Sequence, residues 1–213
     1  MNKFKNLEEL RKMLDDINYV LTKAISNYTF FKHLNNKLIE NENWKYINES
    51  VLEEHNVLFM FLFYGFKDLG VLRFSKILDK NSKKINLYKI ITYIENNYPK
   101  LNRQSEVFFR DKWFFSKFES ITFEEIQVLR SRLDEENKTI DKIKDFRDKK
   151  IAHSDNIENL PWISFEELDK LYNFFVKFIN EIDLRFFSNQ TTNLQIKEDT
   201  EDWLDYLFEK LKD

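Results

Sequence analysis

The sequence predicts an all-α fold built from long helices. Glycine and proline each occur only twice in 213 residues, and turns and strands normally need both. Apolar residues recur at helical spacing along most of the chain, whereas no segment shows the alternation of a half-buried strand. A chain of this length can enclose one sizeable core. We therefore expect a helical bundle over residues 1–187, a polar linker at 188–198 and a short amphipathic helix at 199–213.

Two long helices are predicted near the start of the chain. Residues 6–43 have leucine and isoleucine at helical spacing and form either one long helix or two in series. Asn48 or Ser50 caps a second long helix that continues to about Leu78. This helix contains the most apolar stretch, residues 57–64, which is too short to span a bilayer and is expected to be a buried helical segment.

Shorter helices are predicted in the middle of the chain. A turn at residues 81–84 precedes a short helix at 87–95, which Pro99 is expected to end. Residues 104–118 then form a separate helix rich in aromatic side chains. Core filling is the default assignment for each of the 22 phenylalanines, and some of them could instead form a dimer face.

Two capping boxes mark the starts of the later helices. Thr122 and Glu125 begin a helix of about 122–153, which carries the motif described below. Ser164 and Glu167 begin a strongly apolar helix that is expected to belong to the core.

The charge pattern and the residue types exclude several classes of site. With a net charge of −3 the chain is not a globally basic nucleic-acid binder, but residues 73–89 and 138–153 are locally basic and could attract a phosphate backbone. A solvated helix face is the alternative explanation for each run. Cysteine is absent and the three histidines have no metal-ligand spacing, so we expect neither a metal nor another cofactor. Without an apparent signal peptide or transmembrane segment, we expect a cytoplasmic protein with no membrane partner.

Arg147 and His153 are the strongest candidates for chemistry. A rotation of about 100° per residue places Arg147 within roughly 20° of the apolar stripe of its helix. A buried guanidinium needs an anion, a cavity or a subunit interface. His153 lies about 240° further round the helix, on a different face. Either the helix frays before His153, or one site combines residues from two chains.

Structural explanations exist for both residues. A histidine near a helix C-terminus interacts favourably with the helix dipole, and an arginine on an apolar stripe often forms an ion pair. Candidate ion-pair partners are Glu125, Glu135 and Asp145. Spacing alone favours these explanations over catalysis. Catalysis is nevertheless chemically reasonable, because histidine transfers protons near neutral pH and arginine binds phosphate with a fixed pair of donors.

Arg147 and His153, with five residues between them, resemble the motif of the HEPN superfamily (higher eukaryotes and prokaryotes nucleotide-binding). The block of residues 72–80 and 85–91, the block 164–171 and the order of the helices resemble its AbiU-type branch, which is associated with abortive infection. The likeness covers roughly residues 48–185. It implies an up-and-down helical bundle and a homodimer in which the motifs of two protomers face each other.

The resemblance also implies an activity, because HEPN proteins are mostly metal-independent ribonucleases. His153 would deprotonate the ribose 2′-OH or protonate the leaving 5′-oxygen, and Arg147 would stabilise the negatively charged phosphorane. Asp148 would orient one of these two residues. The RNA backbone would be guided by Lys144, Lys149 and Lys150. The product ends would be a 2′,3′-cyclic phosphate and a 5′-hydroxyl.

We therefore expect an endoribonuclease of phage defence or of a toxin–antitoxin pair, with RNA, a second copy of the chain and an antitoxin protein as candidate partners. The alternatives are a non-catalytic HEPN dimer that binds RNA or a protein, and an unrelated helical interaction protein. Some HEPN toxins have a tyrosine two residues after the histidine, which a partner nucleotidyltransferase modifies. This chain has Asp155 there, so we do not expect control by that route.

Overall fold

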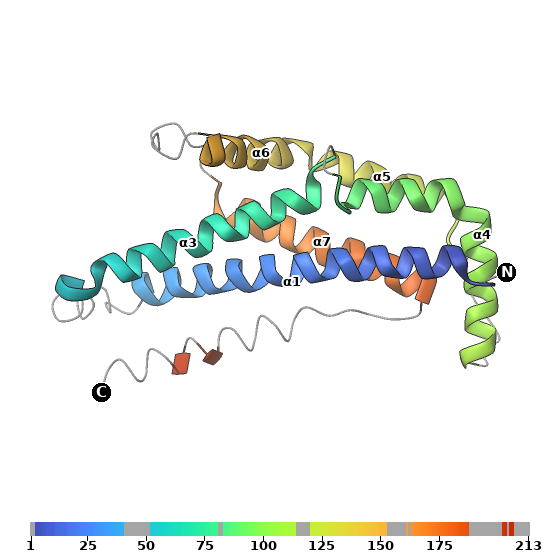
Figure 1. Cartoon of the computed structure of the whole chain (residues 1–213), viewed down its shortest axis with the longest axis horizontal. Helices are drawn as coiled ribbons and strands as arrows, with labels where there is room; N and C mark the ends of the chain where they lie inside the picture. The colour runs from blue at the N-terminus through green and yellow to red at the C-terminus, as the bar shows by residue number, and fades with distance from the viewer. Residues whose placement is uncertain are drawn as a thin grey trace. The chain divides into compact units, whose positions relative to one another are not determined.

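The computed structural model describes residues 3–40, 52–80, 83–113, 120–152, 161, 163–187, 202–203 and 205–206. These residues confirm the all-α prediction, because they form long helices and contain no strand (Figure 1). The main helices are α1 (Lys5–Glu40), α3 (Leu52–Leu78), α4 (Leu87–Trp113), α5 (Phe123–Glu135), α6 (Asn137–Ala152) and α7 (Phe165–Phe187).

Two compact units share these helices. Unit 1 consists of residues 1–21 and 75–192, and unit 2 of residues 22–74 and 193–213. Helices α1 and α3 are each divided between the units, with one part in unit 1 and the other part in unit 2. The predicted boundaries of the linker and the C-terminal helix stay predictions, because residues 188–201 lie outside the described part of the chain.

The core of unit 1 is formed around α7, whose apolar face packs against α4. The predicted capping box at its start is present: the Ser164 N–H donates to the Glu167 carboxylate (2.8 Å), and the Glu167 N–H donates to Ser164 Oγ (3.2 Å). Phe175 and Phe178 on this helix are fully buried. Asp183 is also fully buried, and it accepts a hydrogen bond from Arg11 of α1 (2.7 Å).

The predicted end of a helix before Pro99 is wrong. Helix α4 continues through Pro99 and joins the two segments that the sequence separates. Proline cannot donate to the carbonyl four residues earlier, and Figure 1 shows that α4 changes direction along its length. Ile94 and Leu101, on either side of the proline, are both fully buried. Packing on both sides therefore keeps the bent helix continuous.

The prediction of one motif helix over about 122–153 is also wrong. The capping box of Thr122 and Glu125 starts α5 as expected, but α5 ends at Glu135 and α6 begins at Asn137. Tertiary contacts hold the intervening residue, Glu136, which is nearly buried and forms an ion pair with Lys170 (3.1 Å). The Tyr88 hydroxyl of α4 also donates to the Asn137 side chain (3.0 Å). The apolar stripe thus continues across two helices instead of one.

Unit 2 contains the second part of α1 and most of α3. The rings of Phe30 on α1 and Phe66 on α3 lie 4.0 Å apart between centroids. Residues 202–203 and 205–206 are helical, and the Trp203 ring lies 6.0 Å from that of Phe30. His33 Nε2 lies 2.8 Å from the Asp205 carboxylate. The described part of the C-terminal segment therefore contacts α1.

Candidate functional site

The motif arginine, Arg147, lies near the end of α6 and contacts two carboxylates. Its Nη1 donates to Oδ2 of Asp79 and its Nε donates to Oδ1 of Asp148, each at 2.8 Å. The Arg147 and Asp79 side chains are 22% and 21% exposed, whereas Asp148 is largely exposed. These contacts orient the guanidinium from two sides at the surface of unit 1.

Asp79 is held in place by Asn86, the residue just before α4. It directly follows Leu78, the last residue of α3, and its backbone carbonyl accepts a hydrogen bond from Asn86 Nδ2 (2.8 Å). Asn86 is fully buried, and its side-chain oxygen accepts the N–H of Lys89 (3.0 Å) in the first turn of α4. Because Asn86 bonds both to Asp79 and to the start of α4, local hydrogen bonds help to set the position of Asp79.

The Arg147 guanidinium remains a cation with donors to spare. The hydrogen bond to Asp148, and then that to Asp79, raise the pKa of Arg147 above its ordinary value despite partial burial. Within the described part of the chain, the two bonds use two of the five N–H donors of this side chain. The remaining donors have the planar arrangement that suits a phosphate oxygen pair.

Arg147 therefore forms the expected ion pair, but its partners are Asp79 and Asp148. Of the three predicted candidates, Glu125 instead pairs with Arg185 (2.7 Å) and Asp145 with Lys149 (2.9 Å). Asp79 is not among the predicted candidates, and it is far from Arg147 in the chain. A signal was present, because Asp79 lies in one of the two blocks that carry the family resemblance.

Comparison with protein-family models gives one match, to the family described as AbiU2 of the HEPN group, over residues 69–206. This range is well over half of the chain and includes both Asp79 and Arg147. The chain belongs to the AbiU2 family of HEPN proteins. Neither the comparison with curated proteins nor that with solved structures gives a match.

The other predicted site residues of this AbiU2-family chain lie on or just after α6. Lys149 pairs with Asp145, and Lys144 lies 3.6 Å from Asp141, so acidic neighbours on the same helix partly neutralise both. Lys150 is half-buried in the last turn of α6. His153 immediately follows Ala152, the last residue of α6, and lies outside the described residues. Its predicted role is therefore a proposal.

Metal-binding clusters and membrane-spanning helices are both absent from the described part of this AbiU2-family chain. Among the described residues, no three histidine, aspartate or glutamate side chains gather in a group that could hold a metal ion. The described helices also include none with a stretch long and apolar enough to cross a membrane.

Proposed function

We propose that this chain is a metal-independent endoribonuclease of the HEPN type, acting in phage defence through abortive infection or as the toxin of a toxin–antitoxin pair. The observation that carries the proposal is the Arg147 guanidinium, which Asp79 and Asp148 orient at the end of α6. Membership of the AbiU2 family supports it. The histidine of the motif follows six residues later, as His153.

The proposed reaction is an in-line transesterification of RNA. The ribose 2′-oxygen attacks the adjacent phosphorus and loses its proton to a base, while the bond from phosphorus to the 5′-oxygen breaks and that oxygen takes up a proton. His153 is the proposed proton donor or acceptor. Arg147 stabilises the additional negative charge of the phosphorane through its remaining N–H donors. The products are a 2′,3′-cyclic phosphate and a 5′-hydroxyl.

Asp79 and Asp148 are proposed positioning residues for Arg147. A guanidinium held by two carboxylates loses little side-chain entropy when it binds a phosphate, because its orientation is already restricted. The lysines of the same helix would attract the RNA backbone electrostatically. These are Lys144, Lys149 and Lys150. A second copy of the chain would bring another motif to the same site, as the family resemblance implies.

The test is cleavage of total RNA by purified protein in the presence of EDTA, with His153→Ala beside the wild type. General acid–base catalysis contributes roughly a hundred- to ten-thousand-fold, so His153→Ala should abolish detectable cleavage. His33→Ala is the matched control, because His33 lies in unit 2 and contacts Asp205. Cleavage by His153→Ala at the wild-type rate, or a requirement for added magnesium, would refute the proposed mechanism.

Arg147 provides a second, independent test. Arg147→Ala should inactivate the enzyme, and Arg147→Lys should not restore activity, because an ammonium cannot reproduce the paired donors. Arg103→Ala is the matched control, because Arg103 is exposed on α4 and does not contact Arg147 or its partners. Circular dichroism on each variant separates a loss of activity from a loss of fold.

A non-catalytic HEPN dimer that binds RNA or a protein is the second candidate function. The observation that favours it is the same ion pair, since Arg147 and Asp79 join α6 to the end of α3 and so stabilise the fold. Under this alternative, wild-type protein forms a dimer but does not cleave RNA. Arg147→Ala then lowers the stability of the fold, and neither protein forms an RNA cleavage product.

A further inference from the structure

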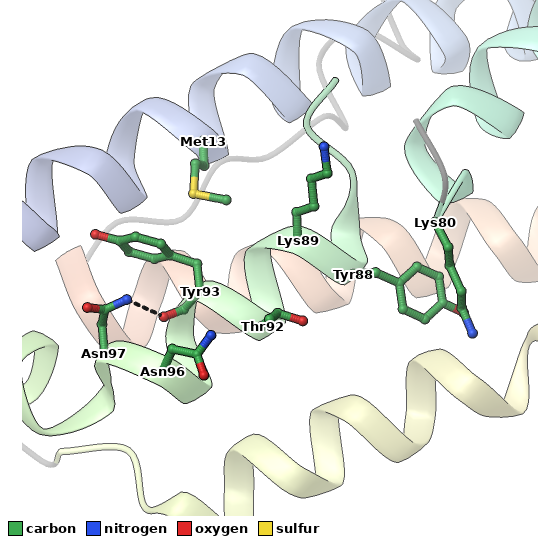
Figure 2. Close-up of a pocket in the computed structure, with 8 residues that line it drawn as sticks. All are labelled: Met13, Lys80, Tyr88, Lys89, Thr92, Tyr93, Asn96 and Asn97. Carbon is green, nitrogen blue, oxygen red and sulfur yellow. Dashed lines mark hydrogen bonds between the residues drawn. The ribbon is translucent and has the colours of Figure 1, made fainter. Parts of the chain in front are cut away.

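A surface groove on unit 1 lies beside α4, with the first part of α1 opposite (Figure 2). Its volume is about 380 Å³, which lies at the lower end of the range of about 300 to 1,000 Å³ for small-molecule sites. Figure 2 shows Lys80 and Tyr88 toward one end of the groove, Tyr93 and Asn97 toward the other, and Lys89 between them. The groove thus has lysines in its middle and at one end, and a tyrosine ring, Tyr93, at the other end.

The charge of the groove favours an anion. Two of its eight lining residues are lysines and none is acidic, although the chain as a whole has a net charge of −3. The Lys89 ammonium donates to the backbone carbonyl of Lys83 (2.9 Å), a neutral acceptor that fixes its position without cancelling its charge. Lys80 is less available, because its ammonium lies over the Tyr88 ring and 3.4 Å from Asp134. Lys89 is therefore the main candidate for binding a phosphate.

The other end offers a fixed ring. The Tyr93 hydroxyl donates to the Glu9 carboxylate (2.7 Å), and it also lies 3.2 Å from the Asn6 carbonyl oxygen. Burial and the Glu9 carboxylate raise the pKa of Tyr93 to about 12, so this ring stays uncharged near neutral pH. A neutral, anchored ring beside the thioether of Met13 is suited to contact with a flat base.

An exposed amide, Asn96, completes the groove. The neighbouring Asn97 side chain is engaged, because it donates to the Tyr93 carbonyl (2.9 Å) and accepts from Asn6 (2.9 Å). Asn96 is exposed and makes no side-chain hydrogen bond to the described part of the chain. Its amide can therefore both donate to and accept from a ligand. It lies seven residues after Lys89, which corresponds to about 10 Å along α4.

We infer that this groove binds one nucleotide of a single-stranded RNA, with the phosphate at Lys89 and the base beside Tyr93 and Asn96. The inference rests on the proposed function for its choice of RNA. Lys80 directly follows Asp79, the partner of Arg147. In this proposal, a strand whose reactive phosphate lies at Arg147 continues past Lys80 into the groove. The groove would hold the RNA next to the cleaved bond.

The experiment measures binding separately from cleavage. The probe is a fluorescein-labelled single-stranded oligoribonucleotide with 2′-O-methyl riboses, which cannot be cleaved because the nucleophilic hydroxyl is blocked. Fluorescence anisotropy is recorded over a salt series for wild type, Lys89→Ala and Asn96→Ala. Lys100→Ala is the matched control, because Lys100 is exposed on the same helix and does not line the groove.

Lys89→Ala should weaken binding about tenfold at low salt and reduce the slope of log affinity against log salt by about 0.7, the value for one phosphate contact to a single strand. Asn96→Ala should weaken binding about two- to tenfold, as expected for one lost hydrogen bond. Lys100→Ala should bind as the wild type does. The inference is overturned if wild type does not bind the probe, or if the groove variants and the control behave alike.

Binding of free AMP and CMP shows whether the groove binds a nucleotide within an RNA strand or a free nucleotide. If either one binds as tightly as the oligonucleotide and loses affinity in Lys89→Ala, the groove is a site for a free nucleotide and the RNA assignment is wrong. The nuclease assay is independent of both results. Binding in the groove without any RNA cleavage would refute the nuclease and support the groove. RNA cleavage by the wild type, together with unaltered probe binding by the groove variants, would support the nuclease and refute the groove.

Discussion

The ion pair between Arg147 and Asp79 should contribute measurably to the stability of unit 1. Exposed ion pairs contribute about 0.2 to 1 kcal/mol, whereas breaking a buried pair costs about 3 to 5 kcal/mol. Here the donor and acceptor atoms are 2.8 Å apart, and the side chains are 22% and 21% exposed. Water therefore screens the pair only in part. We expect an interaction free energy of about 1.5 kcal/mol, at the low end for a hydrogen bond between charged groups.

A double-mutant cycle measures this interaction directly. Asp79→Asn, Arg147→Gln and the double variant are compared with wild type by urea unfolding, and the coupling free energy is calculated from the four midpoints and slopes. The control is a cycle on Lys80 and Asp134, which lie 3.4 Å apart with side chains that are 42% and 45% exposed. Its coupling should be below about 0.5 kcal/mol, because the pair is long and well solvated.

A coupling at Arg147 no larger than that of the control pair would refute this reasoning. Arg147 would then not be held by Asp79 in solution, and the proposed positioning of the guanidinium would lose its support. A coupling of about 1.5 kcal/mol together with inactive Asp79→Asn would instead connect the orientation of Arg147 with cleavage.

The remaining predictions concern the helix ends and the core. Thr122→Ala removes the N-cap of α5 and should lower the free energy of unfolding by about 1 kcal/mol, whereas Ser131→Ala on the exposed face of the same helix should not lower it. The pKa of the Glu167 carboxyl is lowered from 4.5, mainly by its ion pair with Lys142 of α6 and then by its capping hydrogen bond with the Ser164 N–H. Its stabilisation is thus complete above about pH 4.5 and is lost as the pH falls through the folded-state pKa. Glu167→Gln should therefore be less stable than wild type at neutral pH, and this difference in the free energy of unfolding should shrink in acid. Urea unfolding at a series of pH values tests this, with Glu166→Gln as the control variant. Asp183→Asn should destabilise the fold by about 3 kcal/mol, the lower limit for a broken buried pair. The lower limit applies because the side chain of its partner, Arg11, is 31% exposed and can reach water. A change below about 1 kcal/mol in urea unfolding would contradict this.

Features that depend on local sequence were predictable. Both capping boxes are present as expected, because each needs only two side chains within one helical turn. The long helices α1 and α3 follow from continuous helical spacing over residues that contain no proline. Scarcity of glycine and proline likewise predicted the all-α class.

Features that depend on packing were not predictable. Pro99 is a strong local signal for the end of a helix, but burial of Ile94 and Leu101 on either side outweighs the lost hydrogen bond. Conversely, the apolar stripe across Glu136 suggests an unbroken helix. Contacts with Lys170 and with the Tyr88 hydroxyl hold the interruption there. In both places partners distant in sequence decide the backbone conformation.

The sequence by itself determined the helical class, the family and the identity of the motif arginine, because composition, periodicity and a short motif carry that information. Only the tertiary structure decided that Asp79 joins Asp148, its neighbour in the chain, as a second carboxylate partner of Arg147. Asp79 directly follows α3, and its carboxylate accepts a hydrogen bond from Arg147 on α6. Helical periodicity relates residues within one helix, but it does not predict which helix ends contact one another. For this reason the sequence offered Glu125, Glu135 and Asp145 as candidate partners of Arg147. The structure shows that Asp79 forms the ion pair instead.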